Sequence, residues 1–81
     1  MNKNIAFTSL VRIEGRQYEF NFRKKPSAET IFQADVTNVK GERIMFTMIF
    51  TEGIWHTSGA LLPAWIQKHT ELIGQTIHEN T

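Results

Sequence analysis

The sequence contains no cysteine, only two prolines and a single aspartate among its 81 residues. Without cysteine there is no disulfide scaffold and no thiolate metal site, so the fold depends on the packing of its core, with or without help from a second subunit. A chain of this length builds one small domain, which we expect to span residues 1–81 and to fray at residues 1–4 and 79–81.

The sequence also lacks any hydrophobic run of the roughly 20 residues that a membrane-spanning helix requires. Its N-terminus, Met-Asn-Lys-Asn, is not followed by the apolar core and cleavage site of a signal peptide. Hydrophobic residues make up 41% and charged residues 21%, which is typical of a folded globular protein. We therefore expect a soluble, cytoplasmic protein with no membrane partner.

Apolar residues that alternate with polar ones predict β-strands over the first three quarters of the sequence. The clearest case is the run Tyr18, Phe20 and Phe22, in which one polar residue separates each aromatic from the next. The expected strands cover residues 5–13, 17–23, 30–37 and 43–51, with a short fifth strand over residues 54–57. Glycine-containing turns between most of these runs predict an antiparallel meander.

Beyond Gly59 the spacing of apolar residues changes to that of an α-helix, with Pro63 in its first turn. One stripe of this helix carries Trp65, Ile66, Leu72, Ile73 and Ile77. Gly74 lies inside the helix and costs about 1 kcal/mol relative to alanine. The expected fold class is therefore α+β: a four- to five-stranded antiparallel meander sheet with one C-terminal α-helix packed on one face.

One helix covers only one face of such a sheet. The aromatic face is the expected core, and it carries Phe7, Tyr18, Phe20, Phe22, Phe32, Phe46 and Phe50. The other face would expose apolar side chains at Leu10, Ile31, Met45 and Ile49. Because these residues cluster on a small domain, they predict a surface for self-association as a homodimer or for an unknown protein partner.

Charge is distributed unevenly along the sequence, with a net charge of +4 over residues 1–25 and −3 over residues 26–81. The basic residues of the first hairpin and its exit loop are Arg12, Arg16, Arg23, Lys24 and Lys25. A basic edge of this kind is able to bind the phosphates of single-stranded nucleic acid. The alternative is that the charges protect a sheet edge from aggregation.

The order of four strands followed by a helix resembles a single repeat of the PUR family of nucleic-acid-binding proteins and the related whirly-type arrangement. The resemblance is one of layout and covers most of the chain. It implies a sheet that binds nucleic acid, but it assigns that role to no particular residue.

The histidines are the remaining candidates for chemistry. His69 lies on the apolar stripe of the helix, and packing could bring it close to His56. Trp55 and His56 precede Gly59 at the junction between strand and helix, where contacts to a small ligand could converge. No metal-binding or nucleotide-binding motif is present, no serine or threonine lies in an activating context, and no cofactor is expected.

These patterns predict a non-enzymatic binding or interaction module that associates with itself through the uncovered sheet face or an edge strand. The first alternative is a weak single-stranded nucleic-acid binder that uses the basic hairpin. The second is a small-molecule site built around Trp55, His56 and His69.

Overall fold

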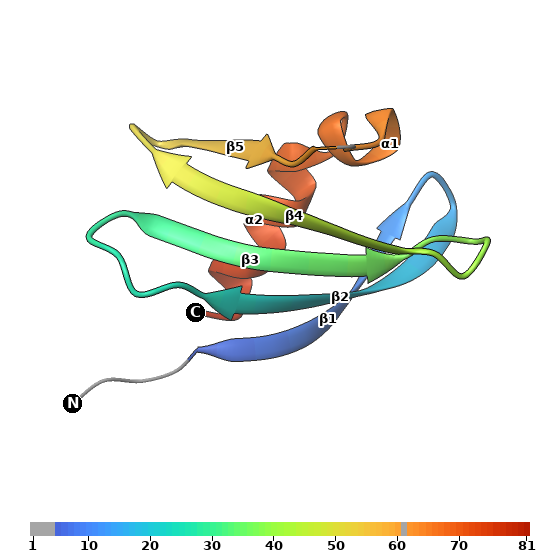
Figure 1. Ribbon diagram of the computed structural model, residues 1–81, viewed down its shortest axis with the longest axis horizontal. Coiled ribbons are helices and arrows are strands. Elements are labelled where there is room, and N and C mark those ends of the chain that lie inside the picture. Colours follow the sequence, from blue (N-terminus) through green and yellow to red (C-terminus); the bar gives the residue numbers. More distant parts are fainter. Residues whose placement is uncertain (1–4, 61) are drawn as a thin grey trace.

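The computed structural model describes residues 5–60 and 62–81 and shows five β-strands followed by two short helices (Figure 1). The strands are β1 (Ala6–Ile13), β2 (Arg16–Lys24), β3 (Thr30–Thr37), β4 (Arg43–Thr51) and β5 (Ile54–Ser58). The helices are α1 (Ala64–Gln67) and α2 (Thr70–Glu79). The α+β class and the C-terminal helix on the sheet, both predicted from the sequence, are confirmed.

The five strands form one antiparallel sheet in the order β1-β2-β3-β4-β5, so each strand pairs with its neighbours in sequence. Two of the hairpin loops contain two residues each, Glu14-Gly15 and Glu52-Gly53, and all four residues have positive φ. Positive φ at both loop positions gives the turn a twist that matches that of the paired strands. The glutamate-glycine pairs therefore fix the register of the first and last hairpins.

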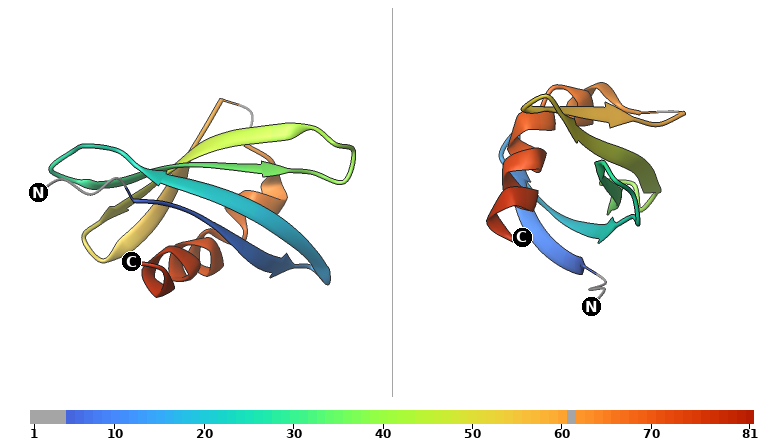
Figure 2. Two further views of the ribbon diagram at one scale, coloured as in Figure 1. Left: turned by 90° about the horizontal axis from the view of Figure 1, so that it is seen from below. Right: turned by 90° about the vertical axis from the view of Figure 1, so that its left-hand side faces the viewer.

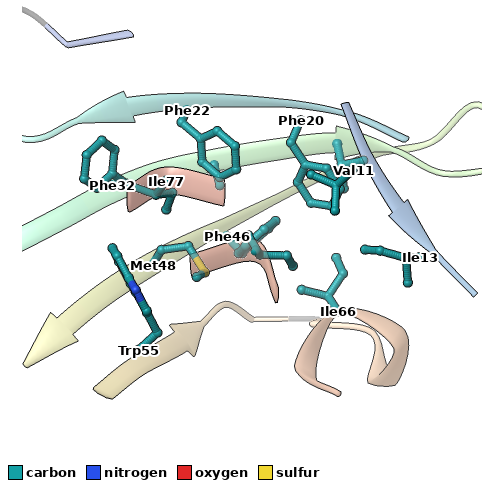
Figure 3. Packing of buried hydrophobic residues seen from close by; sticks show 13 residues of the cluster. Val11, Ile13, Phe20, Phe22, Phe32, Phe46, Met48, Trp55, Ile66 and Ile77 are labelled. Atoms are coloured by element: carbon teal, nitrogen blue, oxygen red, sulfur yellow. The ribbon is translucent and has the colours of Figure 1, made fainter. Parts of the chain in front are cut away.

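The two faces of the sheet differ because side chains alternate along each strand. The inner face, which points toward the helices, supplies most of the core, including Phe20, Phe32, Phe46 and Met48 (Figure 3). The sheet is strongly twisted, and α2 lies across its inner side, where it contacts both edge strands, β1 and β5 (Figure 2). Ile66 of α1 is also fully buried, so both helices contribute to closing the core.

Gly74 allows α2 to pack directly on the indole ring of Trp55, which is buried on β5. A Cβ atom at position 74 would lie 2.6 Å from Trp55 Nε1 and closer still to the Cγ and Cδ1 atoms of the same ring. The glycine that weakens the helix in isolation is thus required by the contact between helix and sheet.

The prediction of one continuous helix with Leu72 on its buried stripe is wrong in two respects. The helix is interrupted at Lys68 and His69, where the Thr70 hydroxyl donates to the Gln67 carbonyl at 2.9 Å and so replaces a helical backbone bond. After this break the buried side of α2 contains Ile73, Gly74, Thr76 and Ile77, whereas Leu72 is exposed.

The C-terminal residues are held by hydrogen bonds. Helix α2 includes Glu79, the Asn80 amide group donates to the Thr76 carbonyl at 2.9 Å, and the Thr81 hydroxyl donates to the Ile77 carbonyl at 2.9 Å. Residues 1–4, the other segment expected to fray, lie outside the described residues. Neither described helix is long and apolar enough to cross a membrane.

Replacing Gly74 with alanine is expected to lower the free energy of unfolding by about 2 kcal/mol, the usual cost of overpacking a core. At a helical position with free space, the same change would raise it by about 1 kcal/mol. Urea denaturation followed by circular dichroism distinguishes the two signs. Gln75→Ala, on the exposed side of the same helix, is the control and should change stability by less than about 0.5 kcal/mol. A Gly74→Ala variant more stable than the wild type would contradict the close approach.

Candidate functional site

The open face of the sheet, defined as the side turned away from α1 and α2, is not covered by any described element. Five large hydrophobic side chains are exposed among the described residues, namely Leu10, Val39, Met45, Ile54 and Leu72. Leu10, Met45 and Ile54, which are 61%, 54% and 56% exposed, alternate with the inward-facing residues of their strands and so lie on the open face. This face is therefore a candidate binding surface.

One part of the open face is formed by uncharged side chains of β3 and β4. Ile31 pairs with Ile49, and Gln33 pairs with Thr47, so the four side chains form a compact block. Met45 lies further along β4 and pairs with Asp35, whereas Leu10 lies on the edge strand β1 and pairs with Glu19. Of the four residues predicted for self-association, three are therefore on neighbouring strands, and Leu10 is separate from them.

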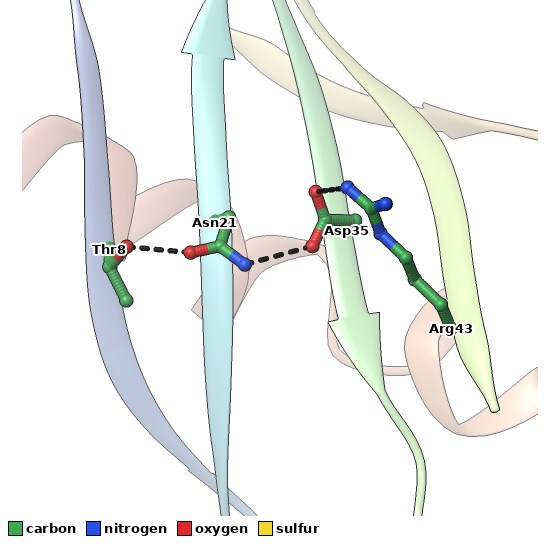
Figure 4. A network of polar contacts seen from close by, with 4 residues as sticks. All are labelled: Thr8, Asn21, Asp35 and Arg43. Atoms are coloured by element: carbon green, nitrogen blue, oxygen red, sulfur yellow. Dashed lines mark hydrogen bonds and ion pairs between the residues drawn. The ribbon is translucent and has the colours of Figure 1, made fainter. Parts of the chain in front are cut away.

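A line of polar side chains crosses the open face from β1 to β4 (Figure 4). The Thr8 hydroxyl donates to Asn21 Oδ1 at 2.6 Å, and Asn21 Nδ2 donates to Asp35 Oδ1 at 2.9 Å. Arg43 then forms an ion pair with Asp35 Oδ2 at 3.0 Å. Thr8, Asn21 and Asp35 pair directly across β1, β2 and β3. Arg43 lies two residues before Met45, the β4 partner of Asp35, so it reaches Asp35 diagonally.

Asp35 is the only aspartate of the sequence, and its side chain is 16% exposed. Burial alone would raise the pKa of its carboxyl group, but the hydrogen bonds from Asn21 and Arg43 and the positive charge of Arg43 together outweigh that effect. The pKa is therefore lowered below its ordinary value of 3.8. Asp35 is an anion at neutral pH, and each of its two carboxylate oxygens accepts a hydrogen bond from a neighbouring side chain.

The polar line borders a trough of about 560 Å³ on the open face. Arg23 and Gln33 line this trough together with Met45 and residues of the polar line. Its lining thus combines one large exposed apolar side chain with several hydrogen-bonding groups and the three charged residues Arg23, Asp35 and Arg43. An arrangement of this kind accepts a side chain of mixed character from a partner surface.

The five basic residues of the predicted nucleic-acid site fall at two ends of the first hairpin. Arg12 and Arg16 lie near the turn between β1 and β2, where Arg12 donates to the Gly15 carbonyl at 3.3 Å. Arg23, Lys24 and Lys25 lie at the other end of β2, about 26 Å away for an extended strand of this length. The structure does not gather the five residues into one cluster, and only Arg12 lies on an edge strand.

The residues predicted for a small-ligand site are also separated. Trp55 is buried on the inner face, whereas its neighbour His56 is exposed and pairs with Ile49 on the open face. His69 lies beside Glu14, with 3.4 Å between His69 Nε2 and Glu14 Oε2. The three residues therefore do not line a common pocket.

The partner of Trp55 is His78, for which the sequence predicted no role. Trp55 Nε1 donates to His78 Nε2 at 3.1 Å, and the His78 ring packs edge-on against Phe50 with ring centroids 4.9 Å apart. The only sequence signal for this contact is the position of His78 four residues after Gly74, one helical turn further along α2.

Comparison of the chain with models of protein families, with curated proteins and with solved structures finds no match. The described residues contain no group of three or more histidine, aspartate or glutamate side chains arranged to hold a metal ion. The open face is therefore interpreted from its own geometry.

Arg43→Gln is expected to raise the pKa of Asp35 and to lower the free energy of unfolding by about 1 kcal/mol or less at pH 7. An aspartate with a lowered pKa stabilises the fold above its unfolded value and loses that contribution as the pH falls through the folded value. The stability difference should therefore vanish at acidic pH. A ¹³C NMR titration of the Asp35 carboxyl group measures the shift directly. Arg12→Gln, which removes a cation that does not contact Asp35, should leave this pKa unchanged, and an equal effect of both variants would contradict the assignment.

Proposed function

We propose that this protein is a non-enzymatic interaction module that forms a homodimer by packing two open faces together. The observation that carries the proposal is that three of the five exposed large hydrophobic residues in the described part of the chain lie on the open face. Ile31 and Ile49, a half-buried pair on neighbouring strands, add apolar surface between Met45 and Ile54, whereas Leu10 lies apart on β1. Apolar side chains gathered on one face of a small domain are typical of an interaction surface.

The pattern of charge on the open face supports an interface between two copies. One part of β3 and β4 is uncharged on this face and carries Ile31, Gln33, Thr47 and Ile49. The charged residues lie outside this part: Arg12, Glu19 and Arg23 on β1 and β2, and the ion pair of Asp35 and Arg43 further along β3 and β4. Interfaces are depleted of charge at their centre and polar at their rim. Because both signs of charge are present, a two-fold axis can place an acidic residue of one copy beside a basic residue of the other.

The shape and size of the open face also fit a second copy. The same face carries the exposed side chain of Leu10 and the trough lined by Met45. An exposed side chain of one copy can therefore enter the trough of the other. The molecule measures 39 × 23 × 23 Å, which is large enough to supply the roughly 800 Å² per partner of a standard interface. Two sheets packed face to face are a common arrangement in β-proteins.

The hydrogen bonding of the polar line favours a binding role over a catalytic one. Asn21 bridges Thr8 and Asp35, and both oxygens of Asp35 accept hydrogen bonds from neighbouring side chains. Groups held in this way organise a surface, whereas an acid or base needs a proton-transfer atom directed at a substrate.

Wild-type protein is expected to sediment as a dimer at high concentration, and Met45→Lys should raise the dimer dissociation constant by at least about tenfold, because it places a charge at an apolar contact. Leu72→Lys is the matched control, since it adds the same charge at an exposed apolar position on α2, away from the open face. Sedimentation velocity measures both variants, and circular dichroism confirms that they fold.

A wild-type protein that stays monomeric at every accessible concentration would contradict the proposal. A dimer that tolerates Met45→Lys as well as Leu72→Lys would also contradict it and would point instead to pairing through the edge strands β1 and β5.

A further inference from the structure

A second hollow, of about 310 Å³, lies at the turn end of the first hairpin and on the opposite side of the sheet from the open face. It is formed by the β1–β2 hairpin, the loop between β3 and β4, and α1. The side chains that matter for its chemistry are Arg16, Tyr18, Lys40 and Trp65. None of the interactions described for the open face uses this hollow.

Two aromatic rings form one wall of the hollow. Tyr18 and Trp65 stack with ring centroids 4.7 Å apart and an angle of 22° between the ring planes. Both side chains are half-buried and both line the hollow, unlike Phe20 and Phe46, which are enclosed in the core. The stack is therefore a fixed aromatic surface that is partly accessible to a ligand.

The cations that line the hollow are not held in ion pairs. The hollow is also lined by two glutamates: Glu14 contacts Lys68 at 3.6 Å and His69 at 3.4 Å, whereas Glu42 accepts a hydrogen bond from the uncharged Asn38 side chain at 2.9 Å. Among the described residues, neither Arg16 nor Lys40 has an acidic partner within ion-pair distance. The hollow thus presents two available cations beside an aromatic wall.

We propose that this hollow binds a nucleotide, with the base against the Tyr18–Trp65 stack and the phosphate between Arg16 and Lys40. Aromatic side chains bind bases by stacking, and arginine and lysine bind phosphate by charge and hydrogen bonding. The volume is at the lower end of ligand sites, which suits one base with its phosphate. The ligand is either a free nucleotide or one residue of a single-stranded nucleic acid, since both present the same groups.

The nucleotide site is independent of the proposed dimer. Ile13 and Tyr18, which line the hollow, belong to the inner side of the sheet, whereas Leu10 and Met45 belong to the open face. Packing two open faces together therefore leaves the hollow accessible, and loss of the dimer does not predict loss of nucleotide binding.

The two tryptophans provide a direct test by NMR. Adenosine 5′-monophosphate titrated into ¹⁵N-labelled protein should shift the indole N–H resonance of Trp65 and the backbone amides of Arg16 and Lys40 in a saturable way. The indole of Trp55, buried and bonded to His78, is the internal control and should not move. Adenosine and inorganic phosphate, each carrying half of the recognised groups, should bind more weakly than the complete nucleotide.

Removing both cations with Arg16→Ser and Lys40→Ser is expected to raise the dissociation constant for adenosine 5′-monophosphate by at least about tenfold. Lys24→Ser with Lys25→Ser is the matched control, because it removes the same charge from the other end of β2 and from residues that do not line the hollow. The control pair should bind the nucleotide as the wild type does.

A single-stranded oligothymidylate distinguishes the two sources of the ligand. Much tighter binding of the oligomer than of the mononucleotide at the same residues would identify a nucleic-acid strand, and equal affinity would identify a free nucleotide. The proposal is overturned if the nucleotide moves no resonance at the hollow. It is equally overturned if inorganic phosphate alone produces the same response, or if the Lys24 and Lys25 variant loses as much affinity as the Arg16 and Lys40 variant.

Discussion

The contact between Gly74 and the Trp55 indole sets the distance between α2 and the sheet, and the rest of the core depends on that distance. A five-stranded meander has one inner face to bury, and this chain covers it with two short helices, α1 and α2. By packing its backbone on the indole, α2 comes close enough for Ile73 and Ile77 to become fully buried. The 1 kcal/mol or so that glycine costs in a helix is offset by this burial.

Because all helices lie on one side, the opposite side of the sheet must be stabilised by its own side chains or by a partner. The line from Thr8 to Arg43 satisfies the polar groups of one part of this face, and the block around Ile31 and Ile49 leaves another part apolar. The hollow beside Tyr18 and α1 arises differently, because the short α1 leaves the end of the inner face incompletely covered. The two proposed binding sites therefore follow from the same shortage of covering elements.

Much of the fold could be predicted from local patterns, but the sites could not. The alternation around Phe20 and the turn at Glu14-Gly15 are local signals, and they located the strands and the first hairpin correctly. Local spacing also placed Leu72 on the buried stripe, which is wrong because the helix is interrupted at Lys68 and His69 and one continuous spacing does not apply across the break. The basic residues of β2 are close in sequence, yet the length of the extended strand separates Arg16 from Arg23 and Lys24.

The sequence by itself determined the meander of neighbouring strands, the face to which the strand side chains point and the presence of a C-terminal helix, because these depend on periodicity and on turns between neighbours. Only the tertiary structure decided which side chains meet across long distances in the sequence. Trp55 contacts His78, and Tyr18 stacks on Trp65, because the twist of the sheet and the break between α1 and α2 bring them together. Contacts of this kind depend on the angle at which a helix crosses a sheet, and no local pattern encodes that angle.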